Sequence, residues 1–438
     1  MNIPNSNLKR IVIAGGGFGG LQLAKNLPVG KYQVVMIDRH NYHCFQPLLY
    51  QVATAGLEAG NIAFPLRKIF QTKEGFYFRM TEVKEVDAER RKVITAIGDL
   101  SYDFLVLATG SATNFFGNES LERHSMSMKT ITEALNIRSL LLQNFEKALL
   151  TDDLKERQSL MNVVIVGGGP TGVELAGAVS ELKKHILPRD YPDLDFRWMD
   201  VKLLEAGDQL LSGMADISSQ KAEKYLKKLG VQVMTNTMVK GFDGKSIQTA
   251  DSTIPAQTLI WAAGVHCKPP KGLVPSAIAK GNRIAVDEFN RVKGHKHIFA
   301  IGDAAQMSTE KYPQGHPMVA QPAIQQGRNL AKNLLRDLKD KPWRPFKYID
   351  LGSMATIGRT KAVSELPGWK SQGAIAWLIW IFVHLMALVG FRNRLVVFIT
   401  WTYNFINYNR DIRLIIRPFR SFEERRTERL RSSEVHAD

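Results

Sequence analysis

Apolar and polar residues near the N-terminus follow one another in the order strand, glycine-rich loop, helix, strand. The apolar run 11–14 leads into the loop 15–20, a helical stretch covers 21–27, and a second apolar run occupies 33–38. The pattern predicts a βαβ unit. The same order returns at 162–205, so the chain is expected to contain two such units.

Each unit has a further matching strand. Residues 102–110 and 257–264 are both apolar runs that end in a turn of small residues. The polar helical stretch 130–158 lies between the units and is expected to connect them. A later apolar run, 297–303, is predicted to be a strand, but its sequence does not assign it to either unit.

The last 70 or so residues change in character. Residues 374–390 form a run of 17 without a formal charge, in which His384 is the strongly polar side chain. The next apolar residues recur at steps of three and four, which predicts an amphipathic helix: Phe398, Trp401, Phe405, Tyr408, Ile412 and Ile415. Arginines surround this stripe: Arg392, Arg394, Arg410, Arg413, Arg417 and Arg420.

Length, composition and charge restrict the class of protein and the kinds of partner. With 438 residues, 45% of them apolar and 23% charged, the chain is expected to be a globular protein of several domains. The net charge of +16 favours an anionic partner, such as nucleic acid, a phosphate-rich cofactor or an acidic membrane. Two cysteines, Cys44 and Cys267, make no CxxC pair, and the polar first ten residues lack a signal peptide's pattern. We therefore expect a reducing compartment.

The first glycine loop has the spacing of a dinucleotide site. Gly15, Gly17 and Gly20 form G-x-G-x-x-G between a strand and a helix, where backbone amides and the helix N-terminus can bind a pyrophosphate. Asp38 ends the next strand and can accept hydrogen bonds from ribose hydroxyls. A glycine-rich turn without a nucleotide is the alternative interpretation.

The second loop repeats the arrangement with Gly167, Gly169 and Gly172, and Glu205 is the acidic residue. An insertion near residues 187–192 lengthens the connection to it. Glu205 would repel a 2′-phosphate, so we expect NADH rather than NADPH. Two dinucleotide sites in one chain suit FAD in one and a nicotinamide in the other, as hydride transfer requires.

Three further stretches carry a resemblance to a known family. Residues 298–303, ending in Asp303, resemble the second FAD motif of disulfide-reductase-like flavoproteins, and that resemblance assigns the first loop to FAD. Residues 38–54 and 320–327 resemble type II NADH dehydrogenases, the single-subunit, non-pumping NADH:quinone oxidoreductases. The resemblance covers nearly the whole chain. It implies electron transfer from NADH to FAD and then to a quinone of the respiratory chain, menaquinone or ubiquinone.

The resemblance also implies site residues. Gln321 and Gln325, in A-Q-x-A-x-Q, would line the quinone site, Glu174 would lie between nicotinamide and flavin, and Lys361 would lie near the flavin. A polar helix start, a carboxylate favoured by the helix dipole and a surface lysine are the respective alternatives. The expected FAD contacts are Gly15, Gly17, Phe18, Gly19, Gly20, Asp38, Gln46, Thr54, Gly110, Gly302 and Asp303. The expected NADH contacts are Gly167, Gly169, Thr171, Gly172, Glu205 and Gly264.

The expected fold class is α/β, with two Rossmann-like dinucleotide-binding domains of the disulfide-reductase-like kind and a C-terminal amphipathic helical domain that anchors to a membrane. The expected domains are an FAD-binding part (1–115), a helical connector (116–160), an NADH-binding domain (161–266), a second FAD-binding part with the quinone motif (267–345) and a membrane-binding domain (346–438). No metal site is predicted, because the histidines and cysteines lack metal-ligand spacing.

The C-terminal pattern places the protein on a membrane. The 17-residue run is at the short limit for spanning a bilayer, and the basic aromatic helix that follows suits the interface of anionic lipids. A buried core or dimer helix is the alternative. We expect a peripheral, monotopic protein on the cytoplasmic face of the cell membrane, which forms a homodimer and binds no nucleic acid. A sulfide:quinone reductase, which needs a cysteine pair, and an NADH-sensing regulatory protein are the alternative functions.

Overall fold

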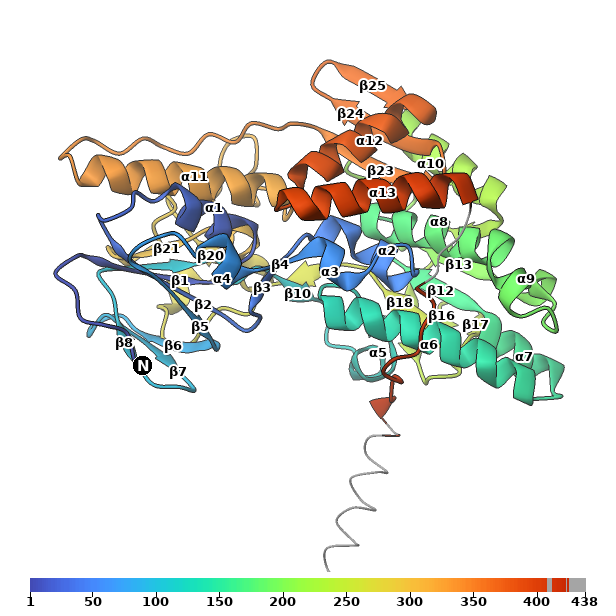
Figure 1. The fold of residues 1–438 in the computed structure, drawn as a ribbon. Helices are drawn as coiled ribbons and strands as arrows, with labels where there is room; N and C mark the ends of the chain where they lie inside the picture. Colours follow the sequence, from blue (N-terminus) through green and yellow to red (C-terminus); the bar gives the residue numbers. More distant parts are fainter. Residues whose placement is uncertain (408–411, 423, 425–438) are drawn as a thin grey trace, which may run out of the picture. The chain divides into compact units, whose positions relative to one another are not determined.

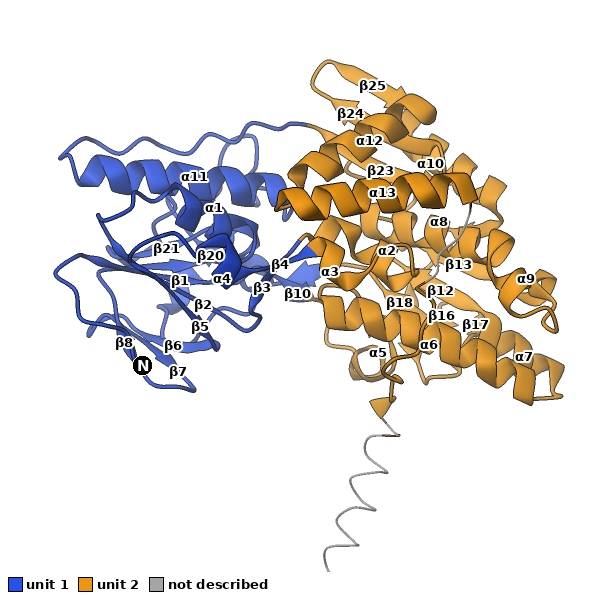
Figure 2. Cartoon of the chain, viewed as in Figure 1, with its two compact units in different colours: residues 1–44, 63–112, 265–351 blue, residues 45–62, 113–264, 352–438 orange. Residues whose placement is uncertain are grey.

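The computed structural model describes residues 1–407, 412–422 and 424. The chain forms two compact units, which are coloured separately in Figure 2. Each unit gathers three separate segments of the chain: residues 1–44, 63–112 and 265–351 make unit 1, and residues 45–62, 113–264 and 352–438 make unit 2.

Unit 1 is built on a parallel five-stranded sheet with β1 at its centre (Figure 1). The strands, in spatial order, are β21 (Ile298–Ala300), β9 (Phe104–Leu107), β1 (Arg10–Ala14), β2 (Gln33–Asp38) and β5 (Phe76–Met80). Strands β1 and β9 are almost wholly buried apolar runs, as is typical of a parallel sheet covered on both faces. The strand expected at 297–303 is β21, and its pairing with β9 assigns it to this unit.

Helices α1 (Phe18–Asn26) and α11 (Ala320–Asp337) pack closely in unit 1. A Cβ atom on Gly327 would lie 2.4 Å from the carbonyl oxygen of Gly19, so this crossing needs glycine. The smaller elements of unit 1 are β3 (Tyr42–Cys44), β4 (Ala63–Pro65), α4 (Leu66–Ile69), β6 (Val83–Asp87), β7 (Lys92–Thr95), β8 (Leu100–Ser101), β20 (Ile284–Ala285) and β22 (Ala305–Gln306). Short strands β10 (Ala112–Thr113) and β19 (Val265–His266) lie where the chain passes from one unit to the other.

Unit 2 contains the second parallel five-stranded sheet. Its strands, in spatial order, are β11 (Met126–Ser127), β18 (Thr258–Trp261), β12 (Val163–Val166), β13 (Val201–Leu204) and β14 (Val231–Met234). A three-stranded antiparallel sheet consists of β15 (Val239–Phe242), β16 (Ser246–Thr249) and β17 (Thr253–Pro255). The fold class expected from the sequence, α/β with two Rossmann-like sheets, is confirmed.

The helices of unit 2 include the expected connector, which is two helices, α6 (Ile131–Leu150) and α7 (Leu154–Met161). A capping box between Thr130 and Glu133 starts α6. The glycine loop leads into α8 (Pro170–His185), and the predicted insertion forms α9 (Leu187–Asp190). The other helices are α2 (Leu49–Ala53), α3 (Ala59–Ile62), α5 (Glu119–His124) and α10 (Asp216–Leu229).

The C-terminal residues pack within unit 2. A hairpin sheet of β23 (Ser353–Gly358), β24 (Lys361–Leu366) and β25 (Trp369–Gln372) lies against α8. A Cβ atom on Gly177 of α8 would lie 2.1 Å from the carbonyl oxygen of Ile357, so glycine is needed for this approach. Helices α12 (Ala374–Ala387) and α13 (Phe391–Asn407) follow and contact each other.

One expectation for the C-terminal helices is wrong. The apolar stripe predicted a helix that continues to Ile415, but α13 ends at Asn407, and residues 412–415 are not helical. Tyr408 and Arg410 lie outside the described residues. Arg413 instead forms a bidentate ion pair with Asp190 of α9. Within the described residues, no helix combines the length and the apolarity that crossing a bilayer requires.

Candidate nucleotide-binding and redox sites

The first glycine loop lies at the carboxyl edge of the unit 1 sheet, between β1 and α1. Gly15 has a φ of +115°, and its Cβ would lie 2.1 Å from the carbonyl oxygen of Ala108. A Cβ on Gly20 would lie 1.9 Å from the carbonyl oxygen of Gly15. In contrast, nothing lies within 4 Å of a Cβ placed on the exposed Gly17. The loop is therefore closely packed at Gly15 and Gly20 but open at Gly17. This open position, at the N-terminus of α1, fits a pyrophosphate.

Asp38 is fixed by this loop at the end of β2. Its carboxylate accepts hydrogen bonds from the Gly16 amide at 2.6 Å and the His40 amide at 2.7 Å. Asp303 follows β21 at the same edge of the sheet and accepts a 2.6 Å hydrogen bond from the Ser111 hydroxyl. Parallel strands thus bring Gly110, which follows β9, to the same edge of the sheet as both acids. This donor and acceptor set suits the ribose and phosphate groups of FAD.

Two residues of this region carry no signal in the glycine pattern. Ser111 contacts Asp303, and buried Gln326 accepts a 2.7 Å hydrogen bond from the Gly302 amide through Oε1. Gly302 has a φ of +71°, so the turn before Asp303 depends on glycine and on this amide contact. Both contacts join segments that are far apart in sequence, so only the folded chain reveals them.

The second glycine loop, in unit 2, repeats the first. Gly167 has a φ of +112°, and a Cβ on Gly172 would lie 1.9 Å from its carbonyl oxygen. Glu205 accepts hydrogen bonds from the amide of Gly168 at 2.5 Å and of Gly207 at 2.7 Å. Unit 2 also contains the other expected NADH contacts, Gly169, Thr171 and Gly264.

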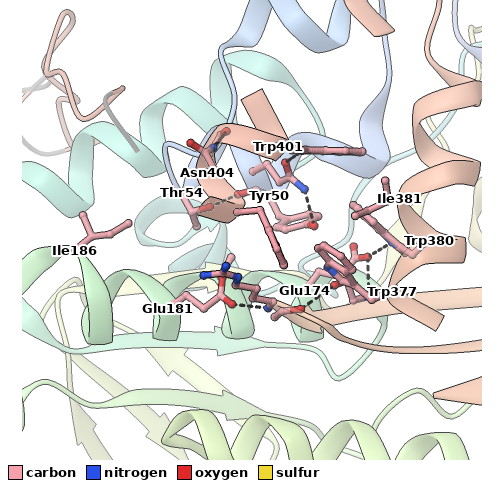
Figure 3. A pocket seen from close by; sticks show the side chains of 17 residues that line it. Tyr50, Thr54, Glu174, Glu181, Ile186, Trp377, Trp380, Ile381, Trp401 and Asn404 are labelled. Atoms are coloured by element: carbon pink, nitrogen blue, oxygen red, sulfur yellow. Dashed lines mark hydrogen bonds between the residues drawn. The ribbon is translucent and has the colours of Figure 1, made fainter. Parts of the chain in front are cut away.

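Glu174 lies on α8, five residues past the helix N-cap, and its side chain is buried. Figure 3 shows its carboxylate beside Trp380 of α12. Oε1 accepts hydrogen bonds from Trp380 Nε1 at 3.2 Å and from the Thr356 amide at 3.4 Å. Burial raises the pKa of Glu174 from 4.5 to about 8, although both hydrogen bonds lower it. The carboxyl group is therefore neutral at pH 7.

Glu174 lines a pocket of unit 2 with about 880 Å³ of empty space, part of it open to solvent. Five of its lining residues are aromatic, and four of these five come from α12 and α13: Tyr50, Trp377, Trp380, Trp401 and Phe405. The charged side chains of Glu181 and Arg359 also line it. The Trp380 ring stacks on His384 with centroids 4.1 Å apart, and burial lowers the pKa of His384 to about 4, so this ring is neutral. The aromatic side chains suit a flat, apolar ring, and Glu174 is a group beside them that can transfer a proton.

Helix α13 is held at the pocket by polar contacts. Trp401 donates a 2.7 Å hydrogen bond to Gln51, whose amide donates a 2.9 Å bond to the Tyr50 hydroxyl. Asn404 donates to the Gly56 carbonyl at 3.2 Å. Thus residues 50–56, near the end of the expected flavin-contacting segment, form one wall of the pocket together with α13.

The remaining expected residues are divided between the units. Thr54 and Gln46 belong to unit 2, where Thr54 lines the pocket and Gln46 donates to the Lys129 carbonyl at 3.3 Å. Lys361 also belongs to unit 2, and its ammonium lies 5.9 Å from the Tyr225 ring centre. Phe18 and Gly19 begin α1 in unit 1.

Gln321 and Gln325 lie on α11 in unit 1 and are both oriented by residues 348–351. Gln325 donates to the carbonyl of Ile349 at 2.8 Å and accepts from its amide at 3.0 Å. Oε1 of Gln321 accepts from the Leu351 amide at 3.0 Å and from the Tyr348 hydroxyl at 3.3 Å. The orientation of the Gln321 amide is therefore set, with its oxygen toward this segment.

The cysteines are both in unit 1 and form no disulfide. The Cys267 thiol donates to the backbone carbonyl of Asp303 at 3.2 Å, and burial raises the pKa of Cys44 to about 12. Cys44 is therefore a protonated thiol at pH 7, and a thiol is a poor nucleophile compared with a thiolate.

Comparisons with known proteins agree with this architecture. The family model of pyridine nucleotide-disulphide oxidoreductases matches residues 9–327, and that of the NDH2 C-terminal domain matches residues 351–411. The type II NADH:quinone oxidoreductase Ndh of Mycobacterium tuberculosis is 33% identical and aligns over 96% of this chain and 93% of its own length.

Solved structures share the fold. The structure of NDH2 from Plasmodium falciparum in complex with NADH has a TM-score of 0.86 at 23% identity, over 92% of this chain and 99% of that one. The sulfide:quinone oxidoreductase of Aquifex aeolicus has a lower TM-score, 0.68, at 20% identity, over 88% and 92% of the two chains. The family resemblance seen in the sequence is confirmed: the chain belongs to the pyridine nucleotide-disulphide oxidoreductases and, within them, to the type II NADH:quinone oxidoreductases.

Proposed function

We propose that this chain is an enzyme that oxidises NADH and reduces a lipid-soluble quinone at a membrane surface, without pumping ions. The observation that carries the proposal is Glu174, a neutral, buried carboxyl group in a pocket that five aromatic side chains line. It lies on α8, the helix that begins at the second glycine loop. One helix thus links a nucleotide-binding loop to a proton donor.

The second loop holds NADH in this proposal. The N-terminus of α8 binds the pyrophosphate, and Glu205 accepts hydrogen bonds from the ribose hydroxyls. Glu205 already accepts the Gly168 and Gly207 amides, which fixes its carboxylate at the loop. A 2′-phosphate would bring a second anion to this carboxylate, so NADH is favoured over NADPH.

The first loop of unit 1 holds FAD, with Asp38 and Asp303 on the same edge of the sheet. When bound, FAD would supply the electron relay between the nicotinamide and the quinone. The protein's own contribution is to bind the pyrophosphate at Gly17 and to position the ribityl and ribose hydroxyls at Asp303 and Asp38. These contacts fix the position of the cofactor relative to unit 1.

Quinone reduction takes up two electrons and two protons. The hydride of NADH accounts for both electrons and one of these hydrogens, and Glu174 supplies the other as a proton. Both hydrogen-bond donors point at Oε1, so the proton of the neutral acid belongs on Oε2. After the proton has left, the N–H groups of Trp380 and Thr356 stabilise the carboxylate. Solvent reaches the open side of the pocket and can return the proton.

The two glutamines of α11 have different parts in this proposal. Gln325 uses its oxygen and its nitrogen on Ile349, which suits it to orient residues 348–351. Gln321 directs its oxygen to the same segment, which fixes the orientation of its side chain, and we retain it as a quinone-contacting residue on the family resemblance. Lys361 stays in the proposal as a cation near the flavin. Its ammonium also contacts the Tyr225 ring, which suits a role in packing.

The α12–α13 hairpin forms the membrane surface. One side of it packs inward through Trp380 and Val397. Ten other apolar side chains of the two helices are exposed: Ile375, Leu378, Phe382, Val383 and Met386 on α12, and Phe391, Leu395, Phe398, Ile399 and Ile406 on α13. Exposed apolar patches of this kind mark contact surfaces, and nearby Arg392 can meet anionic headgroups. A quinone dissolved in the bilayer would then lie beside its pocket.

An anaerobic experiment tests the reaction. The purified protein is mixed with NADH, and the visible absorption of the flavin should bleach; a quinone is then added, and the absorption should return. A flavin that stays oxidised refutes the NADH assignment. A bleached flavin that quinone does not reoxidise refutes the quinone assignment.

A second experiment tests the membrane surface. The wild-type protein should sediment with vesicles of anionic phospholipid, and the double variant Phe382→Glu, Phe398→Glu should stay in the supernatant. Trp198→Glu is the matched control, because Trp198 is also an exposed aromatic residue of unit 2 but lies on another element. Equal sedimentation of the double variant and the wild type would refute the surface.

Two further parts of the proposal concern the assembly and its place in the cell. We expect a homodimer, which sedimentation velocity measures in a non-ionic detergent. We also expect binding to the cytoplasmic face of the cell membrane, which protease accessibility in right-side-out and inverted vesicles distinguishes.

A further inference from the structure

The two glycine loops have the same backbone conformation. Gly15 and Gly167 have φ values of +115° and +112°, and the N-cap glycines Gly17 and Gly169 have φ values of −67° and −71°. The second residue of each loop donates its backbone amide to the acidic side chain at the end of the next strand: Gly16 donates to Asp38, and Gly168 donates to Glu205. Both loops therefore leave the carbonyl of the same residue, Gly16 or Gly168, to be bonded by a group from elsewhere in the unit.

The carbonyl group of the same residue also has a partner in each loop, but of a different kind. In unit 2, the Leu211 backbone amide donates to the Gly168 carbonyl at 2.8 Å. Leu211 has a φ of +51°, a strained conformation for leucine. In unit 1, the partner of the Gly16 carbonyl is a side chain: His43 Nδ1 lies 3.0 Å from it.

The peptide between Gly16 and Gly17 connects this contact to the ligand side of the loop. A peptide group is planar and trans, so its C=O and N–H point in opposite directions. Holding the Gly16 carbonyl toward His43 therefore turns the Gly17 N–H to the side opposite His43. Gly17 is exposed, with nothing within 4 Å of a Cβ placed on it. Its N–H is thus presented where a phosphate oxygen can accept it.

The surroundings of His43 suit a fixed, neutral donor. The residue is 2% exposed and lies on β3, paired with Phe64 of β4. Its ring meets the Phe18 ring edge-on, with centroids 5.1 Å apart. Burial lowers its pKa to about 4, so the imidazole is neutral at pH 7. A carbonyl oxygen can only accept, so Nδ1 carries the proton.

We propose that His43 is a positioning residue for the cofactor: its Nδ1–H holds the Gly16 carbonyl and thereby aims the Gly17 N–H at the pyrophosphate of FAD. The proposal rests on the assignment of the first loop to FAD. His43 plays the part in unit 1 that the strained Leu211 amide plays in unit 2. The loop carbonyl is thus held by a side chain in unit 1 and by a backbone amide in unit 2.

Flavin release from the holoenzyme tests this proposal. Each protein is diluted, and the rise in fluorescence as FAD leaves is followed. His43→Phe keeps a ring but removes the donor, so FAD should dissociate about tenfold faster, as expected for the loss of one hydrogen bond. His43→Asn places an N–H three bonds from Cα, as Nδ1 is, and should bring release back to within about threefold of wild type.

His124→Phe is the matched control, because His124 also meets a phenylalanine ring edge-on, that of Phe242 in unit 2. Its flavin release and the NADH affinity of all variants should match the wild type. Equal flavin release by His43→Phe and the wild type overturns the proposal, as does release that is equally fast in His43→Phe and His43→Asn. A lower NADH affinity with unchanged flavin release overturns the assignment of the first loop to FAD.

Discussion

Trp380→Phe tests how the pocket controls the acidity of Glu174. The Trp380 N–H donates to Glu174 Oε1 at 3.2 Å and stabilises the ionised carboxylate, so it holds the pKa of Glu174 lower than burial alone would. Phenylalanine keeps an aromatic ring against His384, with which Trp380 stacks at 4.1 Å, but it has no donor. The substitution therefore removes one interaction and retains most of the packing.

The expected shift in the pKa of Glu174 follows from the strength of the hydrogen bond that Trp380 donates. A hydrogen bond to a charged group contributes about 1.5–3 kcal/mol, and a length of 3.2 Å places this one at the weak end. Since one pKa unit equals about 1.4 kcal/mol, the loss should raise the pKa of Glu174 by about one unit. The pKa is about 8 in the wild type, so it should be about 9 in the variant.

The assay is the pH dependence of kcat/KM for a short-chain quinone at saturating NADH. Glu174 must be protonated to act as the acid, so activity falls above its pKa. The alkaline limb of Trp380→Phe should lie about one pH unit above that of the wild type. Trp377→Phe is the control: Trp377 lines the same pocket, but its ring packs on Phe405. An unmoved limb in Trp380→Phe, or the same shift in Trp377→Phe, would refute this reasoning.

Three other substitutions test separate parts of the structure. Glu174→Gln should slow flavin reoxidation by quinone about 100-fold in stopped-flow measurements and leave flavin reduction by NADH near the wild-type rate. It should also raise the melting temperature at pH 7.5, because an acid whose pKa is about 8 in the fold and 4.5 outside it destabilises the fold increasingly as pH rises from 4.5 toward 8. Glu205→Gln should raise kcat/KM for NADPH relative to NADH by about tenfold, since it removes one charge repulsion of about 1 kcal/mol or more; an unchanged ratio would contradict the place given to Glu205. Gly177→Ala should destabilise the protein by about 1–3 kcal/mol in urea unfolding, because the new Cβ would lie 2.1 Å from the Ile357 carbonyl oxygen. Gly213→Ala, whose Cβ would meet nothing within 4 Å, should change stability little, and equal effects of the two would argue against the steric account.

Much of the fold could be predicted because its signals are local. The glycine loops, their helices and the strands around them are set by residues within about 40 positions of one another, and they form as expected. The end of α13 could not be predicted in this way. The apolar spacing continues to Ile415, but residues 412–415 are not helical, and Arg413 pairs there with Asp190, more than 200 residues earlier.

The site residues also differ in whether local sequence could predict them. Sequence spacing predicted that Asp38 and Glu205 would lie beside the two glycine loops, because each lies at the end of the strand after its own loop, and each accepts a hydrogen bond from its loop. It gave no signal for His43, whose part depends on a strand bringing it back to Gly16, nor for Trp380, which lies in a run that predicts an apolar anchor. Trp380 is 2% exposed, and its indole N–H contacts Glu174, 206 positions away.

The sequence by itself determined that the chain has two Rossmann-like βαβ units with their phosphate-binding loops, because strand, glycine turn and helix are encoded by neighbouring residues. Only the tertiary structure decided that β21 joins the first sheet and brings Asp303 to the first loop. The C-terminal residues also pack on α8 only in the folded chain, where they close a pocket around Glu174. The physical reason is that the acidity of a carboxyl group depends on solvent and on donors that surround it in space, and these come from segments that sequence spacing does not connect.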